Sequence, residues 1–207
     1  MEVNYDQKKT DQSNQTQNQN TKQTTMTDTT KPKVDSTKDN KTDEGNKVIL
    51  KTGMGEIEIE LYEKDAPLHV ANFKKLVKSG FYNGLTFHRV IPNFMIQGGD
   101  PNSKDKDRSN DGQGGPGYTI PAEIKLKHQK GSLAAARLGD QANPKRESSG
   151  SQFYIVTGDA SHLDGQYTVY GKVTKGYDIC EKIQNVKKDG SDNPVEKVEI
   201  EKISFAK

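Results

Sequence analysis

Alternating apolar and polar residues predict two strands near residue 50. Residues 46–52 form a short apolar run, and a strictly alternating segment, Gly55–Leu61, follows a glycine-rich turn. Its apolar side chains point one way and its acidic side chains the other: Ile57, Ile59 and Leu61 against Glu56, Glu58 and Glu60. Such alternation is typical of an antiparallel strand with one buried and one solvated face. The glutamates are therefore interpreted as the solvated face of a strand, and not as an acidic active site.

Apolar residues that recur about every 3.6 positions predict an amphipathic helix over residues 66–79. Ala66, Val70, Phe73 and Val77 fall on one side of this helix. A proline in its first turn and a glycine after its end agree with these limits. His69 falls on or near the polar side and is predicted to be solvated. A second, shorter helix is predicted over residues 176–185.

Residues 87–100, with the sequence FHRVIPNFMIQGGD, place one cation among apolar and aromatic side chains. They predict two short strands, 87–91 and 94–97, which are interrupted by Pro92 and end at a Gly-Gly turn. Along the first strand Phe87 and Arg89 share one face, and His88 packs on the opposite face. An arginine inside an apolar strand is costly unless its donors are used, so Arg89 is the first candidate for chemistry.

Further strands are predicted over residues 131–137, 151–157, 167–173 and 195–203, separated by polar loops at 102–117 and 138–150. The segment Lys145 to Ser148 is read as solvated loop. Residues 112–117 match the pattern G-x-G-x-x-G, but no strand precedes them and no helix follows, which excludes a dinucleotide site. Seven or eight strands with two helices suggest a mainly β domain closed into a barrel.

Composition divides the chain of 207 residues into two parts. Residues 1–46 carry few apolar side chains and are predicted to form a disordered tail rich in Thr, Asn, Gln and Lys; residues 47–207 are predicted to form one domain. A long polar spacer ahead of a folded domain is typical of a surface-tethered lipoprotein whose signal and anchor have been removed. We favour this extracytoplasmic interpretation over the alternative, a cytoplasmic protein with a polar tail.

Charge and cysteine content exclude several classes of function. The tail carries seven lysines against eight acids, and the net charge of the whole chain is +2, so no nucleic-acid partner is expected. A single cysteine, Cys180, rules out an intrachain disulfide and is interpreted as a small buried residue. His69, His88, His128 and His162 have no metal-ligand spacing, so no metal is expected.

Four blocks of the sequence resemble the cyclophilin-type peptidyl-prolyl cis-trans isomerases. They are residues 87–100, residues 131–137, residues 150–155 (GSQFYI), and residues 163–173, which contain LDGQ and GKV. The resemblance covers roughly residues 47–206. It implies a closed eight-stranded antiparallel barrel with a helix over each mouth. It also implies an enzyme without cofactors that acts on proline-containing peptides and unfolded proteins to assist folding.

The resemblance also implies roles for individual residues. Arg89 would donate to the prolyl nitrogen of a twisted amide, and Gln97 would support Arg89 and the substrate backbone. The remaining site residues would bind substrate: Phe94, Met95 and Leu163 as the proline pocket, Ala136, Arg137 and Gln152 along the peptide groove, and Tyr154, His162 and Tyr167 beside them.

Several positions depart from the pattern of many family members. Tyr154 stands where the family usually has Phe, and Tyr167 where it has His. Arg137 stands where many members have Asn. His162 falls where cyclosporin-sensitive members have Trp, so we expect weak cyclosporin binding. A monomer is expected, because nothing marks an exposed apolar patch.

A binding module that holds proline-containing segments without turnover is the alternative function. Retention of Arg89 favours the enzyme. If Arg89→Ala loses biological activity together with turnover, the protein acts as an enzyme. If the variant keeps its biological activity, the protein acts as a binding module.

Overall fold

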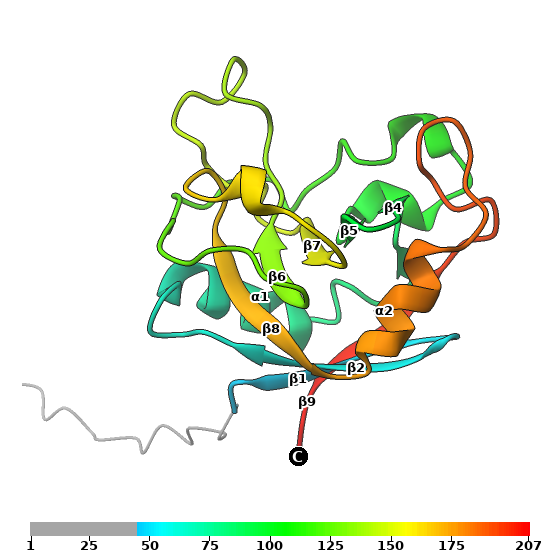
Figure 1. The fold of residues 1–207 in the computed structure, drawn as a ribbon, viewed down its shortest axis with the longest axis horizontal. Helices are drawn as coiled ribbons and strands as arrows, with labels where there is room; N and C mark the ends of the chain where they lie inside the picture. Colours follow the sequence, from blue (N-terminus) through cyan, green and yellow to red (C-terminus); the bar gives the residue numbers. More distant parts are fainter. Residues whose placement is uncertain (1–44) are drawn as a thin grey trace, which may run out of the picture. The chain divides into compact units, whose positions relative to one another are not determined.

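Nine strands form one curled antiparallel sheet in the computed structural model, which describes residues 45–207 (Figure 1). The strands are β1 (Lys47–Thr52), β2 (Gly55–Leu61), β3 (Leu85–Thr86), β4 (Arg89–Ile91), β5 (Met95–Gly98), β6 (Ser132–Ala135), β7 (Phe153–Val156), β8 (Val169–Lys175) and β9 (Glu199–Phe205). Their order across the sheet is β3-β9-β1-β2-β8-β6-β7-β5-β4.

The mainly β fold was predicted, but the structure does not show the closed eight-stranded barrel. Within residues 45–207, β3 pairs with β9 and β4 pairs with β5, and these two outermost strands do not pair with each other. The sheet therefore curls strongly and stays open at this point.

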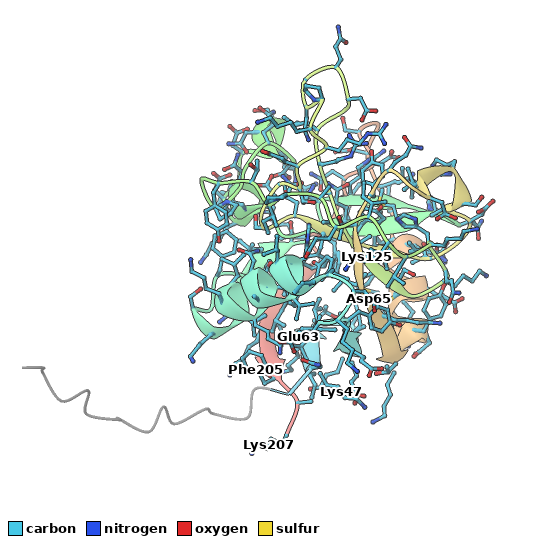
Figure 2. All side chains as sticks on the ribbon, turned by 90° about the vertical axis from the view of Figure 1, so that its left-hand side faces the viewer. Lys47, Glu63, Asp65, Lys125, Phe205 and Lys207 are labelled. Carbon is cyan, nitrogen blue, oxygen red and sulfur yellow. The ribbon has the colours of Figure 1, made fainter. Side chains whose placement is uncertain are left out.

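The first two strands pair as their sequence pattern predicts. Val48 lies opposite Ile59 and Leu50 opposite Ile57, and all four side chains are buried. On the other face Glu58 accepts hydrogen bonds from Lys175 and Thr174. On its second side β1 pairs with β9, which brings Lys47 close to Phe205 (Figure 2).

Two helices cover the main core, close to the predicted limits. Helix α1 (Pro67–Lys78) buries Val70, Phe73 and Val77, and helix α2 (Tyr177–Gln184) buries Ile179, Cys180 and Ile183. They lie apart from each other in Figure 1. Cys180 is fully buried as predicted, and burial raises the pKa of its thiol to about 12.

Three predictions about side-chain exposure are wrong. Phe87 is buried in the core while Arg89 is exposed, because the chain leaves the sheet between β3 and β4 and the strict alternation starts only at Arg89. His69 and Ser148 are not solvated; each is 3% exposed. The cause is a buried hydrogen-bond chain, in which the His69 ring contacts Glu123 at 2.7 Å and the Ser148 hydroxyl at 2.8 Å.

The predicted tail, residues 1–46, lies outside the described residues except for its last two positions. Within the described range, no helix has the length and apolar character needed to cross a membrane.

Candidate active site

One row of residues crosses four neighbouring strands and carries the candidate chemistry. Arg89 of β4 lies opposite Gln97 of β5, Gln97 lies opposite Tyr154 of β7, and Tyr154 lies opposite Ala134 of β6. Residues that lie directly opposite each other on antiparallel strands point to the same face of the sheet. Folding therefore brings together residues that are 65 positions apart (154 − 89 = 65).

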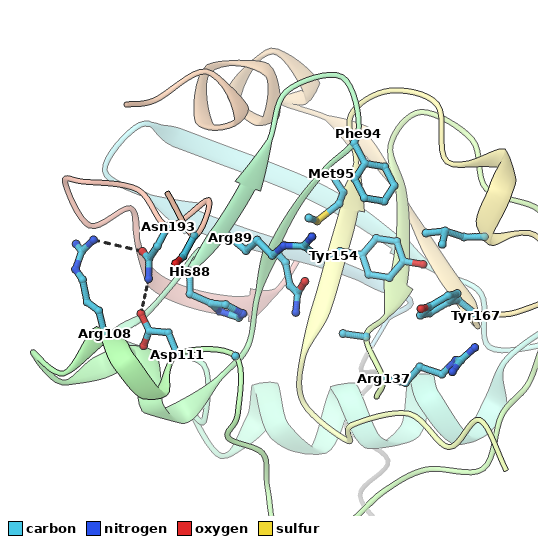
Figure 3. A pocket seen from close by; sticks show the side chains of 15 residues that line it. His88, Arg89, Phe94, Met95, Arg108, Asp111, Arg137, Tyr154, Tyr167 and Asn193 are labelled. Carbon is cyan, nitrogen blue, oxygen red and sulfur yellow. Dashed lines mark hydrogen bonds between the residues drawn. The ribbon is translucent and has the colours of Figure 1, made fainter. Parts of the chain in front are cut away.

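A cavity of about 350 Å³ lies over this row (Figure 3). Its floor is an apolar cluster, separate from the main core, which includes Met95, Ala136 and Tyr154. Most of the predicted site residues line the cavity: Arg89, Phe94, Met95, Gln97, Ala136, Arg137, Tyr154, Leu163 and Tyr167. Gln152 and His162 are the two predicted residues that do not.

Arg89 presents its side chain to this cavity without a protein partner. The residue is exposed, and its guanidinium makes no hydrogen bond or ion pair with any residue in the range 45–207. The expected support of Arg89 by Gln97 is not present as a hydrogen bond among these residues. The Gln97 amide instead donates to the side-chain oxygen of Gln152 at 3.0 Å. A guanidinium with several donors and no protein acceptor is available to a ligand.

Arg137 lies on another wall of the same cavity and uses its donors within the protein. Its Nε donates to the carbonyl of Gln166 at 3.0 Å, and its Nη1 contacts the carbonyl of Leu138 at 2.8 Å and the Asp140 carboxylate at 2.6 Å. Its guanidinium carbon lies 4.4 Å from the centre of the Tyr167 ring, a cation–π geometry. The Arg137 side chain is only 3% exposed. Arg137 therefore shapes the wall of the cavity.

A second hollow, of about 940 Å³, continues from the first and shares Gln97, Gly112, Ala136 and Arg137 with it. Gln152 lines this second hollow and donates to the carbonyls of Gly112 and Gly114 at 2.9 and 2.8 Å. These bonds fix the loop that contains Gly112, which lines both hollows. Together the adjoining hollows form a groove.

The close approach of the backbone just after β5 to the backbone just before β7 requires glycine. Gly99 has a φ of 87°, and a Cβ there would lie 2.3 Å from the carbonyl oxygen of Ser151. Only glycine adopts this conformation readily and leaves room for the neighbouring backbone. The turn places Gln97 within hydrogen-bonding distance of Gln152.

Aromatic side chains form the apolar end of the cavity. Phe94 packs against His162, with ring centres 5.1 Å apart, and the rings of Tyr154 and Tyr167 meet edge to face at 6.1 Å. His162 thus adjoins the cavity through Phe94 and does not line it. Met95 and Leu163 complete an apolar pocket of the kind that could take a proline ring.

One wall of the cavity was missed by the sequence analysis. It comprises His88, Arg108, Asp111, Gly112, Ser191 and Asn193. Arg108 donates to the carbonyls of Pro194 and Val195, and Asn193 donates to Asp111 at 2.6 Å. These contacts tie two loops together that are about 80 positions apart in the chain, so no local pattern could reveal this wall.

His88 lies in the cavity beside Arg89, contrary to the prediction that the two side chains point to opposite faces. It is 4% exposed. Burial lowers the pKa of His88, and the positive charge of Arg89 lowers it further against the opposing effect of Asp100 and Asp111. His88 is therefore neutral near pH 7 and adds no second positive charge beside Arg89.

Among residues 45–207, no cluster of three or more His, Cys, Asp or Glu side chains could hold a metal ion. The cavity offers donors and an apolar pocket, and neither ring nitrogen of His88, the histidine that lines it, has a hydrogen-bond partner among the described residues.

Comparisons with known proteins agree with this arrangement. Residues 47–205 match the family described as "Cyclophilin type peptidyl-prolyl cis-trans isomerase/CLD". The chain is 45% identical over 140 residues to peptidyl-prolyl cis-trans isomerase B of Bacillus subtilis, covering 66% of this chain and 88% of that protein. It is 44% identical over 140 residues to a peptidyl-prolyl cis-trans isomerase of Helicobacter pylori, covering 65% and 78% of the two chains.

A solved structure has the same fold. It is a cyclophilin-type isomerase of Cryptosporidium parvum, determined in the presence of the dipeptide Ala-Pro, with a TM-score of 0.69 and 30% identity. The match covers 78% of this chain and 99% of that one. The sequence, the fold and the cavity lead to one conclusion: the chain belongs to the family of cyclophilin-type peptidyl-prolyl cis-trans isomerases.

Proposed function

We propose that this protein accelerates rotation about Xaa-Pro peptide bonds in flexible or unfolded protein segments and so assists folding. Such rotation has a barrier of about 18–20 kcal/mol and takes tens to hundreds of seconds without a catalyst. No covalent bond forms or breaks, so the reaction needs no nucleophile, metal or cofactor. It needs a site that holds the proline ring and prefers the twisted amide.

Arg89 is assigned the central step. When the amide twists out of plane, conjugation is lost and the prolyl nitrogen regains a lone pair. A donor placed at this nitrogen binds the twisted amide more strongly than either planar isomer, and this preference lowers the barrier. A guanidinium stays protonated at all working pH values and offers donors in a rigid fork.

The observation that carries this assignment is the free guanidinium of Arg89 beside an apolar pocket. Phe94, Met95 and Leu163 would hold the proline ring, and the Gln97–Gln152 pair would meet the substrate backbone. Arg137 could not supply the same donor, because an ion pair, two carbonyls and an aromatic ring already occupy its guanidinium.

Exchange NMR on a short Xaa-Pro peptide tests the proposal. Cross-peaks between cis and trans forms are expected with wild type and not with Arg89→Ala at equal concentration. Arg146→Ala is the matched control: this arginine binds Asp140 at 2.8 Å and lines neither hollow. If Arg89→Ala shows exchange like the control Arg146→Ala, the protein is still an isomerase, but the role assigned to Arg89 is wrong. Shift changes without exchange in wild type would instead indicate a proline-peptide binder.

We also propose weak cyclosporin binding, since His162 replaces the Trp of sensitive members and packs against Phe94. A nanomolar dissociation constant in a fluorescence or calorimetric titration would contradict this.

For location, we propose that residues 1–46 act as a polar spacer that carries the domain outside the cytoplasm as a monomer. Fractionation of cells that express the natural gene tests this proposal. Recovery in the cytoplasmic fraction would support the alternative location.

A further inference from the structure

A hydrogen-bond chain runs from the protein surface to the proline pocket through Asp164, His128 and Tyr154. The His128 Nδ1 lies 2.9 Å from the Asp164 carboxylate, and the His128 Nε2 lies 2.8 Å from the hydroxyl of Tyr154. The His128 side chain is 0% exposed, and Tyr154 is 4% exposed. The planes of the two rings are nearly parallel, with an interplanar angle of 6° and ring centres 5.9 Å apart.

The direction of each hydrogen bond follows from the chemistry of the groups. Hydrogen bonds from the backbone and the ring of His128 hold the pKa of Asp164 below its ordinary value, so this group is a carboxylate and can only accept. In the neutral imidazole of His128, the proton that meets this carboxylate lies on Nδ1, and Nε2 is left as an acceptor. Burial raises the pKa of Tyr154, so its hydroxyl keeps its proton and donates to Nε2.

Tyr154 is the member of this chain that reaches the site. It lies in the strand row with Arg89 and Gln97, lines the cavity and meets Tyr167 edge to face. The other two members come from two different loops, and Asp164 directly follows the cavity residue Leu163. The chain therefore links a strand and two loops at the floor of the pocket.

We infer that His128, held by Asp164, is a positioning residue for the isomerase reaction, which acts through the Tyr154 hydroxyl to fix the ring that faces the substrate proline. This inference rests on the proposed function. A tyrosine ring without the hydrogen bond would have to bury its hydroxyl unpaired or turn it into the pocket, and a buried unpaired hydroxyl is unfavourable. The same three side chains thus keep the floor of the pocket apolar.

A second histidine provides the matched control. His69 has the same kind of partners, a carboxylate at Nδ1 (Glu123) and a hydroxyl at Nε2 (Ser148), and its side chain is 3% exposed, against 0% for His128. It does not line the substrate cavity. Loss of either histidine should lower stability, but only loss of His128 should change how substrate binds.

The experiment compares His128→Leu, Tyr154→Phe, the double variant and His69→Leu by exchange NMR and thermal unfolding. We expect His128→Leu to raise KM about tenfold with little change in kcat, because the pocket contacts substrate and twisted amide alike. In the Tyr154→Phe background the same change should raise KM less than about twofold, because no hydroxyl remains to be held. His128→Gln, which keeps an acceptor, should recover most of the loss.

His69→Leu should lower the melting temperature and leave KM unchanged. An equal effect of His128→Leu on KM in both backgrounds, or no effect in either, would overturn the inference. Nitrogen NMR of the wild-type imidazole gives a second readout that does not need a folded variant. The Nδ1–H tautomer is expected for His128, and the Nε2–H tautomer would contradict the inference.

Failure of this inference is distinguishable from failure of the proposed function. If wild type shows no exchange at all, the function is wrong whatever the tautomer of His128. If wild type exchanges and His128→Leu behaves as wild type, only the positioning role is wrong.

Discussion

Two of the three arginines that line the cavity, Arg89 and Arg137, differ in what else they contact. The guanidinium of Arg89 is exposed and has no hydrogen-bond or ion-pair partner in the part of the chain that the structure describes. The guanidinium of Arg137 is buried against Asp140, two carbonyls and the ring of Tyr167. Identical side chains therefore differ in the donors that they leave available, and the available donors of Arg89, not its charge, are the reason for proposing that it acts on a substrate.

The comparison predicts its largest effect for Arg89→Ala. Removing a donor that acts on the twisted amide should lower kcat/KM by about 100-fold to 1,000-fold, the range found for single donors that stabilise a transition state. Stability should change by less than about 0.5 kcal/mol, because an exposed side chain without partners is lost. Exchange NMR and thermal unfolding measure the two quantities. A large loss of stability would show that Arg89 is structural.

Arg137→Ala should show the reverse pattern. It leaves two carbonyls without their donor and Asp140 with Arg146 as its remaining partner, so unfolding should become easier by about 1–3 kcal/mol. The wall beside Tyr167 loosens, and kcat/KM should fall about tenfold, which corresponds to about 1.4 kcal/mol. Arg137→Lys keeps the charge but not the planar fork and should recover little. Denaturant unfolding at constant pH checks this, and a loss of activity equal to that of Arg89→Ala would break the comparison.

The histidine beside Arg89 predicts a pH effect on stability. Burial lowers the pKa of His88, and also that of His69, below the unfolded value of about 6.5. Below that pH, His88 and His69 bind protons in the unfolded chain but stay neutral in the folded chain. The contribution is therefore fully present above about pH 6.5 and is lost as pH falls, by at most about 1.4 kcal/mol per pH unit for each group. His88→Asn should reduce this slope in denaturant unfolding, and an unchanged slope would contradict it.

The smallest predicted effect is the influence of the Arg89 charge on the pKa of His88. The charge of Arg89 adds to burial in lowering the pKa of His88, and Asp100 and Asp111 oppose it. Arg89→Ala should therefore raise the pKa of His88 slightly, whereas Arg137→Ala should leave it unchanged. Side-chain NMR titration of His88 measures this. An equal shift in both variants would show that the effect is not specific to Arg89.

The features that sequence predicts well are those determined by neighbours along the chain. The alternation in β2 and the helical spacing of α1 place Ile57, Ile59, Val70 and Phe73 in the core as expected. Most of the site residues that the resemblance implies line one cavity, because the resemblance rests on blocks that include adjacent strands. Their roles in catalysis remain predictions.

The features that sequence misses depend on partners far away in the chain. His69 appears solvated because Glu123 and Ser148, its partners, are 54 and 79 positions distant. The wall formed by Arg108, Asp111 and Asn193 was missed for the same reason, because Asn193 is more than 80 positions away from the other two residues. His88 was assigned to the wrong face, because alternation assumes an unbroken strand and the chain leaves the sheet just before Arg89.

The most direct test compares substrate affinity with turnover in Arg89→Ala and Arg137→Ala. Titration of an Xaa-Pro peptide gives its dissociation constant, and exchange spectroscopy of the same samples gives the rate of isomerisation. For Arg89→Ala we predict a rate at least about 100-fold slower with affinity within about threefold of wild type, because the donor acts mainly on the twisted amide. Affinity and turnover that fall together in Arg89→Ala, with a larger loss of turnover in Arg137→Ala, would contradict the account.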